Sequence, residues 1–317
     1  MNPAVWFITG VLVLIIIVGA ILVLIPAFRR YAVVQTGNSV GLAVPPHLEP
    51  ALRRRFVGRL TASLLGATLG LAVAVVALQS GLVPSAESTD VAEFWLVFGG
   101  FFTGASVAVA IYALAAKPAR PEGERYARSG AVDLRDYLAP VDRLGARGAV
   151  ALGVVTLLAA TAVSAAGLTS SNAALSVGGL IVVAGVVALA LSEFASRRIL
   201  ERPQPAGSPS ELAWDDALRA QSLREIVTAP LCLGSWGALA VLFTLVDATD
   251  AVGFGGIVTF WVGAAGLALV FIALLVAAGM SIATKPQQHY LRRLWPDVAA
   301  AATAQTEARV AAQKAGH

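Results

Sequence analysis

Long apolar runs separated by shorter polar stretches dominate the pattern of this chain. Runs such as 11–18 and 180–191 are continuous and lack the alternation of apolar and polar residues that strands of a membrane barrel require. A helix needs about 20 apolar residues to cross a bilayer, and it satisfies its own backbone hydrogen bonds there. Seven runs are long enough, at about 5–28, 57–79, 94–116, 149–168, 173–195, 230–247 and 254–280. The pattern predicts an all-α, polytopic transmembrane helix bundle.

The composition agrees with lipid as the main solvent. Of the 317 residues, 57% are hydrophobic and 13% are charged, whereas soluble domains carry roughly 45–50% apolar and about 25% charged residues. The single cysteine, Cys232, excludes an intrachain disulfide and a multi-cysteine metal site. The abundance of Ala, Val, Leu, Gly and Arg suggests a GC-rich bacterial genome. We therefore expect a multi-pass protein whose first partner is the lipid bilayer of a bacterial plasma (inner) membrane.

The charges sort by connecting segment, and this sorting predicts the orientation. All 23 Lys and Arg residues lie in four regions, 29–59, 117–147, 197–224 and 285–314. Arg59, one turn into the second apolar run, is near enough to the headgroups to snorkel to the same side. The other connections hold only acidic charges, at Glu87, Asp90, Glu93, Asp247 and Asp250. Because Lys and Arg mark the cytoplasmic face, we expect the N-terminus outside, the C-terminus in the cytoplasm, and no nucleic-acid partner behind the net charge of +4.

This alternation divides the chain into one anchor and three helical hairpins. Three units begin near 53, 145 and 224, and each repeats a basic stretch, an outward span, a short turn and a returning span. Membrane topology and internal duplication explain the repetition about equally well. The expected boundaries are a transmembrane anchor at 1–30, a cytoplasmic loop at 31–55, a hairpin at 56–116, a loop at 117–148, a hairpin at 149–195, a cytoplasmic segment with an amphipathic helix at 196–229, a hairpin at 230–281 and a cytoplasmic tail at 282–317.

The segment 203–228 has the clearest local signals outside the apolar runs. Ser208, Pro209 and Glu211 stand at the N-cap, first and third positions of a predicted helix, the arrangement of a capping box. We expect an ion pair between Asp215 and Arg219, four residues apart. The helix is interpreted either as a capped amphipathic connector or as a docking helix for a cytosolic partner. The candidate docking residues are Trp214, Asp215, Asp216 and Arg219.

Ionisable residues are absent from the middles of the apolar runs, which argues against ion-coupled transport and against catalysis in the membrane. Glu193, near the inner end of the fifth run, is expected either to pair with the neighbouring Arg197 and Arg198 or to act as a gating carboxylate. The last run has no lysine for a retinal Schiff base, and the three histidines are dispersed. No phosphate-binding loop or hydrolase motif is present. We predict no cofactor, no metal site and no enzymatic activity.

Small and hydroxyl residues are the remaining pattern within the runs. Gly66 with Gly70, and Gly100 with Gly104, match the small-xxx-small spacing that lets helix backbones approach closely. We expect these glycines in helix packing, with a hinge or a pore lining as the alternative. Hydroxyls in the runs are expected to bond within the bundle, and a polar translocation path is the alternative reading. They are Thr61, Ser63, Thr68, Thr103, Ser106, Thr156, Thr161, Ser164, Ser235 and Thr259.

The segments 197–205 and 214–219, with the apolar bundle, resemble multi-pass integral membrane proteins of actinobacteria that have no established activity. The resemblance implies no site residues. Our leading hypothesis is a non-enzymatic membrane component or accessory subunit that acts through helix packing and contacts with a cytoplasmic or membrane protein. The alternative is a transporter or permease subunit for a small or lipophilic solute.

Overall fold

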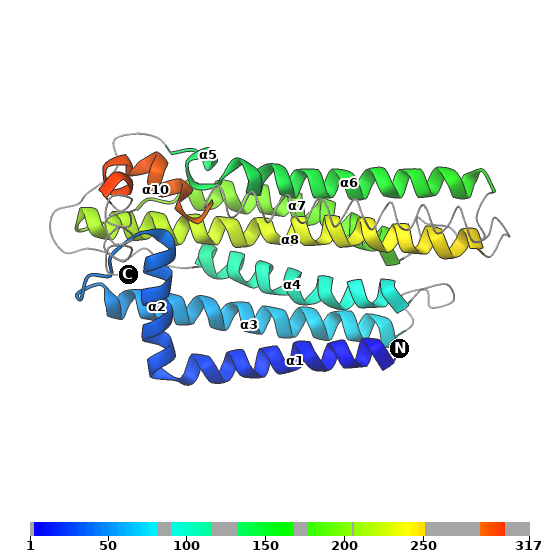
Figure 1. The fold of residues 1–317 in the computed structure, drawn as a ribbon, viewed down its shortest axis with the longest axis horizontal. Helices are drawn as coiled ribbons and strands as arrows, with labels where there is room; N and C mark the ends of the chain where they lie inside the picture. The colour runs from blue at the N-terminus through cyan, green and yellow to red at the C-terminus, as the bar shows by residue number, and fades with distance from the viewer. Residues whose placement is uncertain are drawn as a thin grey trace, which may run out of the picture.

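The computed structural model describes residues 3–80, 90–115, 132–167, 177–204, 206–250 and 286–301, and these ranges contain helices but no strand. Six helices are long and apolar enough to cross a membrane. They are α1 (Pro3–Leu24), α3 (Glu49–Gln79), α4 (Asp90–Ala115), α6 (Pro140–Ala165), α7 (Val177–Leu200) and α8 (Pro209–Asp250). Figure 1 shows them side by side along the longest axis of the molecule. The predicted all-helical, multi-span class is confirmed, and the seventh predicted run, 254–280, lies outside the described residues.

Two groups of helices make up the bundle. α3 packs mainly against α4, with α1 on their outer side, whereas α6 and α7 both pack against α8. Contacts of α4 with α8 and α7 join the two groups. α8 is more buried than any other candidate span, and it lies between α4 and the pair α6 and α7 (Figure 1). α8 is therefore the central helix of the described bundle.

The four glycines of the small-xxx-small pattern lie where α3 and α4 meet. A Cβ atom added at Gly66 would overlap the backbone of Gly104, and one added at Gly70 would overlap the backbone of Gly100. The backbones of the two helices are therefore in direct contact. A residue larger than glycine at these positions would hold them farther apart. The structure thus places all four residues in helix packing.

The sides of the bundle are apolar and exposed. Leu65 and Leu69 on α3 are 66% and 67% exposed, and Val155 and Leu158 on α6 are 62% and 64% exposed. Rows of large apolar side chains on this scale are unfavourable in water and are typical of a surface that faces lipid. The six apolar helices and their surface are compatible with a multi-pass membrane protein.

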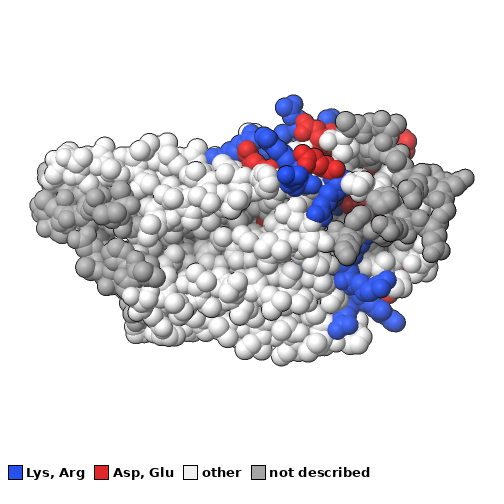
Figure 2. Space-filling view, turned by 180° about the vertical axis from the view of Figure 1, so that it is seen from behind, with Lys and Arg blue, Asp and Glu red and all other residues white. Residues whose placement is uncertain are grey.

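Four short elements gather at one end of the bundle. They are α2 (Pro26–Val40), α5 (Leu134–Tyr137), a 3₁₀ turn at Pro286–Gln288 and α10 (His289–Leu294). α2 runs across the bundle axis there (Figure 1). The described arginines belong to this end as well, and Figure 2 shows them clustered with acidic residues beside a long uncharged remainder. We call it the arginine-rich end: α1, α4 and α7 finish there, and α3, α6 and α8 begin there.

The segment 203–228 differs from its sequence-based description. The sequence suggests a connector helix that leads to a separate span near Pro230, but α8 runs without interruption from Pro209 to Asp250. Pro230 lies inside the helix and is fully buried. Between residues 211 and 230 every residue of α8 is buried or half-buried. Packing of α8 against α4, α6 and α7 holds the helix together across a proline that would favour a break in an isolated chain.

Candidate functional site

The largest hydrophobic cluster of the described residues lies at the arginine-rich end, where short elements pack against the ends of the spans. It combines Val33 and Val40 of α2, Tyr137 of α5, Tyr290 of α10 and a series of α8 side chains. The α8 members are Trp214, Ala217, Ala220, Leu223 and Ile226. We call this part, made of α2, α5, α10 and residues 209–226 of α8, the end layer. It resembles the core of a small soluble domain attached to the bundle.

Asp216 is the polar centre of the end layer. Its side chain is 0% exposed, and it accepts hydrogen bonds from the Tyr137 hydroxyl at 2.7 Å, the Gln204 amide at 3.0 Å and the Trp295 indole N–H at 2.9 Å. A buried carboxylate is tolerated only when such donors replace water. Asp216 of α8 therefore holds three other parts of the chain against α8. They are α5 through Tyr137, the segment before α8 through Gln204, and the residue after α10, Trp295.

The loop between α2 and α3 is fastened to the same helix. The indole N–H of Trp214, which is 3% exposed, donates to the Ala43 carbonyl at 3.0 Å. The hydroxyl of Tyr290 donates to the Val40 carbonyl at 3.4 Å. Burial raises the pKa of Tyr290, and the nearby Asp216 carboxylate adds to the rise. Trp214 thus links α8 to the loop after α2, and Tyr290 links α10 to the last residue of α2, each through a polar tip on an apolar body.

Arginine side chains cap the C-terminal ends of the helices that end here. Arg29 donates to the Val23 carbonyl in the last turn of α1. Arg202 donates to the Ala113 and Leu114 carbonyls at the end of α4, the first of them at 2.9 Å. Arg219 donates to the Leu200 carbonyl at the end of α7 and to the Arg202 carbonyl at 2.9 Å. The last carbonyls of a helix lack intrahelical donors and carry partial negative charge, so a guanidinium satisfies both needs.

Acidic residues stand where helices begin. Glu49, Asp142 and Glu211 lie in the first turns of α3, α6 and α8, where the helix dipole favours negative charge. At the start of α8, the Ser208 hydroxyl accepts from the Glu211 N–H at 3.2 Å, so the predicted N-cap is confirmed. The Glu211 carboxylate accepts from the Gly207 N–H at 2.8 Å, one residue before the position that a capping box assigns to it.

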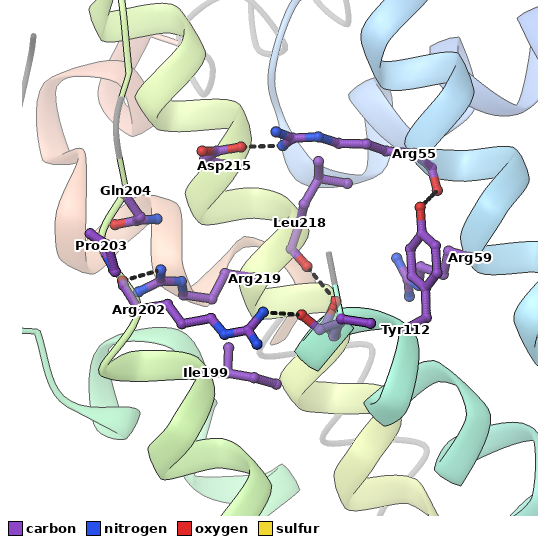
Figure 3. Close-up of a pocket in the computed structure, with 13 residues that line it drawn as sticks. Arg55, Arg59, Tyr112, Ile199, Arg202, Pro203, Gln204, Asp215, Leu218 and Arg219 are labelled. Atoms are coloured by element: carbon purple, nitrogen blue, oxygen red, sulfur yellow. Dashed lines mark hydrogen bonds and ion pairs between the residues drawn. The ribbon is translucent and has the colours of Figure 1, made fainter. Parts of the chain in front are cut away.

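A cavity of about 430 Å³ separates the two groups of helices at the arginine-rich end. Arg55 and Arg59 reach it from α3, Arg202 from the segment after α7, and Asp215 and Arg219 from α8 (Figure 3). The remaining lining is Tyr112, Ala113, Ala115, Ile199, Pro203, Gln204, Leu218 and Ser222. The lining therefore combines four guanidinium groups with an apolar wall.

Two ion pairs hold the α3 side of the cavity to α8. Arg55 pairs with Asp215, and Arg59 forms a two-point contact with Glu225, with its Nε 2.8 Å from one carboxylate oxygen. The Arg59 side chain is only 10% exposed. A forked guanidinium–carboxylate contact of this kind fixes both partners in position. Arg59 lies at the arginine-rich end, and its side chain contacts a carboxylate on α8 that is 166 residues away in the sequence, a partner that the sequence did not predict.

The four candidate docking residues lie within one stretch of α8 but contact different parts of the chain. Trp214 faces the α2–α3 loop and Asp216 faces α5 and Trp295. Asp215 and Arg219 line the cavity. The predicted pair between Asp215 and Arg219 is replaced by contacts of each with other segments. Their docking role stays a prediction, and the structure leaves little of Trp214 and Asp216 at the surface.

Sequence reasoning also missed partners that are distant in the chain. Glu193 pairs with Arg147 of α6 at 2.7 Å and not with the neighbouring Arg197 or Arg198. Arg198 pairs with Glu201. The signal available in the sequence was the excess of arginine in each connecting segment, which does not say which arginine faces which helix end or carboxylate.

Comparison with known proteins gave no further guide: no family model, curated protein or solved structure matches the chain. The resemblance to actinobacterial membrane proteins stays a prediction.

Proposed function

We propose that this chain is a non-enzymatic, multi-pass protein of a bacterial plasma membrane that works as an accessory component through its cytoplasmic side. The observation that carries the proposal is the end layer, a packed core with the buried Asp216 at its centre, which α2, α5 and α10 form with the arginine-rich ends of the spans. Ordering four separate segments costs conformational entropy. A chain that served only as a membrane anchor has no need of such a structure.

The distribution of charge supports an end layer that faces the cytoplasm. Described arginines cluster at that end (Figure 2), whereas Asp90, Glu93, Asp247 and Asp250 lie at the opposite ends of α4 and α8. With the positive end inside, the N-terminus is outside and the C-terminus is cytoplasmic.

Cysteine labelling tests this orientation. Asn38 on α2 and Ser80 after α3 are exposed and lie at opposite ends of the bundle. In a Cys232→Ala background, an impermeant maleimide added to intact cells should label Ser80→Cys and should label Asn38→Cys only after the membrane is opened. The reverse pattern would place the end layer outside and refute the proposal.

The exposed side of α2 is the surface of the end layer that we propose contacts a protein partner. Arg30, Tyr31 and Val34 are exposed there, with Tyr31 at 64% and Val34 at 52%. Their opposite side, including Val33 and Val40, is buried in the end layer. A firmly held helix that presents an aromatic, an aliphatic and a basic side chain together has the composition of a protein contact surface.

Co-purification tests the accessory role. The wild-type chain, extracted in mild detergent, should bring down one partner in fixed ratio, and Tyr31→Ala with Val34→Ala should abolish this association. The matched control is Val155→Ala with Leu158→Ala, which removes a similar exposed apolar area from α6. Loss of the partner in the control alone, or retention in both variants, would overturn the assignment of α2.

The alternative of a transporter or permease subunit gains no support from the described spans. The hydroxyls of Thr156, Thr161 and Ser164 donate to the carbonyls four residues earlier in α6. Thr68 on α3 and Thr244 on α8 do the same. Hydroxyls bound to their own helix satisfy their donor locally, whereas the Thr103 hydroxyl on α4 is buried without a hydrogen-bond partner among the described residues.

A further inference from the structure

We propose that the cavity between α3, α4, α7 and α8 is a binding site for a phosphate group. Its lining holds the guanidinium groups of Arg55, Arg59, Arg202 and Arg219, and Asp215 is the one carboxylate among the described residues that line it. Guanidinium groups recognise phosphate because their planar set of N–H donors matches the phosphate oxygens. The proposal concerns a ligand, and it is independent of the accessory role proposed above.

The charges of the cavity are unequally compensated. Arg55 and Arg59 each pair with a carboxylate, Asp215 and Glu225. Arg219 has no carboxylate partner among the described residues: it donates to the carbonyl oxygens of Leu200 and Arg202, and its guanidinium lies 5.9 Å from the Tyr137 ring centre. Carbonyls and an aromatic face stabilise a cation without cancelling its charge. An anion in the cavity would supply that compensation.

The arginines are also held in place before any ligand arrives. Arg59 is fixed by its two-point contact with Glu225, and Arg219 is fixed by the carbonyls at the end of α7. A guanidinium has five N–H donors, and the two donors that Arg219 uses leave others for a ligand. Because little side-chain entropy remains to be lost, such prearranged donors bind more tightly than free surface arginines.

The position and the walls of the cavity fit a phosphate attached to an apolar or neutral group. The cavity opens between the ends of α4 and α7, the level at which a membrane-spanning helix reaches the headgroups. Ala113, Ile199 and Leu218 supply an apolar side. A volume of about 430 Å³ exceeds what a phosphate alone fills. The same chemistry is carried by the headgroup of an anionic phospholipid and by a soluble phosphate compound, and the lipid source rests on the proposed membrane placement.

The test uses the full-length chain, purified in detergent and stripped of lipid. Native mass spectrometry follows the binding of phosphatidylglycerol, with phosphatidylcholine of the same acyl chains as the zwitterionic comparison. Calorimetry follows the binding of inorganic phosphate and of glycerol phosphate. Preferential binding of phosphatidylglycerol with no response to the soluble phosphates identifies a lipid headgroup site, and the reverse pattern identifies a soluble ligand.

Two variants, one expected to weaken the affinity and one expected to strengthen it, test whether the ligand binds in the cavity. Arg219→Gln should weaken affinity about tenfold, the effect of losing one charge-assisted hydrogen bond. Asp215→Asn should strengthen affinity severalfold, because it removes the carboxylate that competes for Arg55. Arg224→Gln is the matched control, because Arg224 lies on the same helix in an ion pair with Asp142 and does not line the cavity. Its affinity should equal that of the wild type.

Three results would overturn the proposal: no binding of any of these probes, equal affinity in all variants, or weakening by Arg224→Gln as large as by Arg219→Gln. If Arg219→Gln does not elute as a single species in gel filtration, Arg55→Gln is used in its place. The prediction that Asp215→Asn raises the affinity is the same in either case. None of these outcomes affects the co-purification experiment, so a failure of the phosphate site and a failure of the accessory role are distinguishable.

Discussion

Replacing Asp216 by alanine should loosen the contacts of α5, the segment before α8 and the residue after α10 with α8, while leaving the rest of the bundle folded. The carboxylate accepts hydrogen bonds from Tyr137, Gln204 and Trp295, and it has no exposed surface. The substitution leaves these donors without their acceptor. It also opens a small space at the point where α5, the segment before α8 and the residue after α10 meet.

The size of the effect follows from opposing contributions. A hydrogen bond to a charged group is worth about 1.5–3 kcal/mol, so three independent bonds would sum to about 4.5–9 kcal/mol. The bonds share one acceptor and are not additive. Removing the carboxylate also recovers the several kcal/mol that its burial costs. We expect a net loss of about 3 kcal/mol in the stability of the end layer.

Hydrogen exchange measured by mass spectrometry on the detergent-solubilised chain reports this loss locally. Peptides that cover 134–138 and 286–301 should exchange about a hundredfold faster in Asp216→Ala, the factor that corresponds to about 3 kcal/mol. Peptides from the contact between α3 and α4 should be unchanged. Asp216→Asn, which keeps the shape and one acceptor oxygen, should give an intermediate rate.

Asp215→Ala is the matched control, since it removes the adjacent carboxylate. Asp215 pairs with Arg55, whose side chain is 37% exposed, and a pair that is partly in water contributes about 1 kcal/mol or less. If exchange at 286–301 rises equally in both variants, or does not rise in Asp216→Ala, then Asp216 does not hold the end layer together.

Three further outcomes are expected. Gly70→Leu should lower the thermal midpoint in detergent and expose α3 to proteolysis, because a side chain there meets the backbone of α4. Gly148→Ala, with open space around it inside α6, should not lower the midpoint, because alanine favours a helix over glycine. Arg59→Gln should lower the free energy of unfolding, measured by denaturant titration, by about 1–3 kcal/mol. This is less than for a fully buried ion pair, because Glu225 is 39% exposed. Equal stability of the variant and the wild type would contradict the pairing. The pKa of Tyr290 is raised in the folded chain, so the folded state holds this proton more tightly than the unfolded state. The free energy of unfolding should therefore fall as the pH rises above about 10. This fall should be smaller in Tyr290→Phe.

The features that sequence could predict are those determined by local composition. Continuous apolar runs predict helices of spanning length regardless of their neighbours, and six of the seven lie in the described residues as expected. The Gly66 and Gly70 spacing predicts close packing because only glycine lets two helix backbones touch. The cap at Ser208 likewise depends on residues within one turn.

What sequence could not predict depends on contacts between distant segments. The stretch 211–219 alternates charged and apolar residues in a way that is typical of an exposed amphipathic helix. Asp216 is enclosed because Tyr137 of α5 and Trp295 after α10 cover it, whereas Asp215 and Arg219 contact α3 and the end of α7. None of these partners is close to 211–219 in the sequence, so the local pattern does not reveal them. The partners of Arg59 and Glu193 were missed for the same reason, since each pair joins residues far apart in the chain.

The arginines show why a charge count predicts topology yet not a site. In the positive-inside rule each cation counts equally, wherever its side chain points. In the structure, Arg29 and Arg202 close the ends of α1 and α4, Arg59 joins α3 to α8, and Arg219 closes α7 while it also lines the cavity. The helices that end here carry partial negative charge on their last carbonyl groups. Arginines concentrated on one side of a membrane are therefore also well placed to donate hydrogen bonds to these carbonyls. A cavity between such helix ends is then lined by guanidinium groups as a consequence of the architecture.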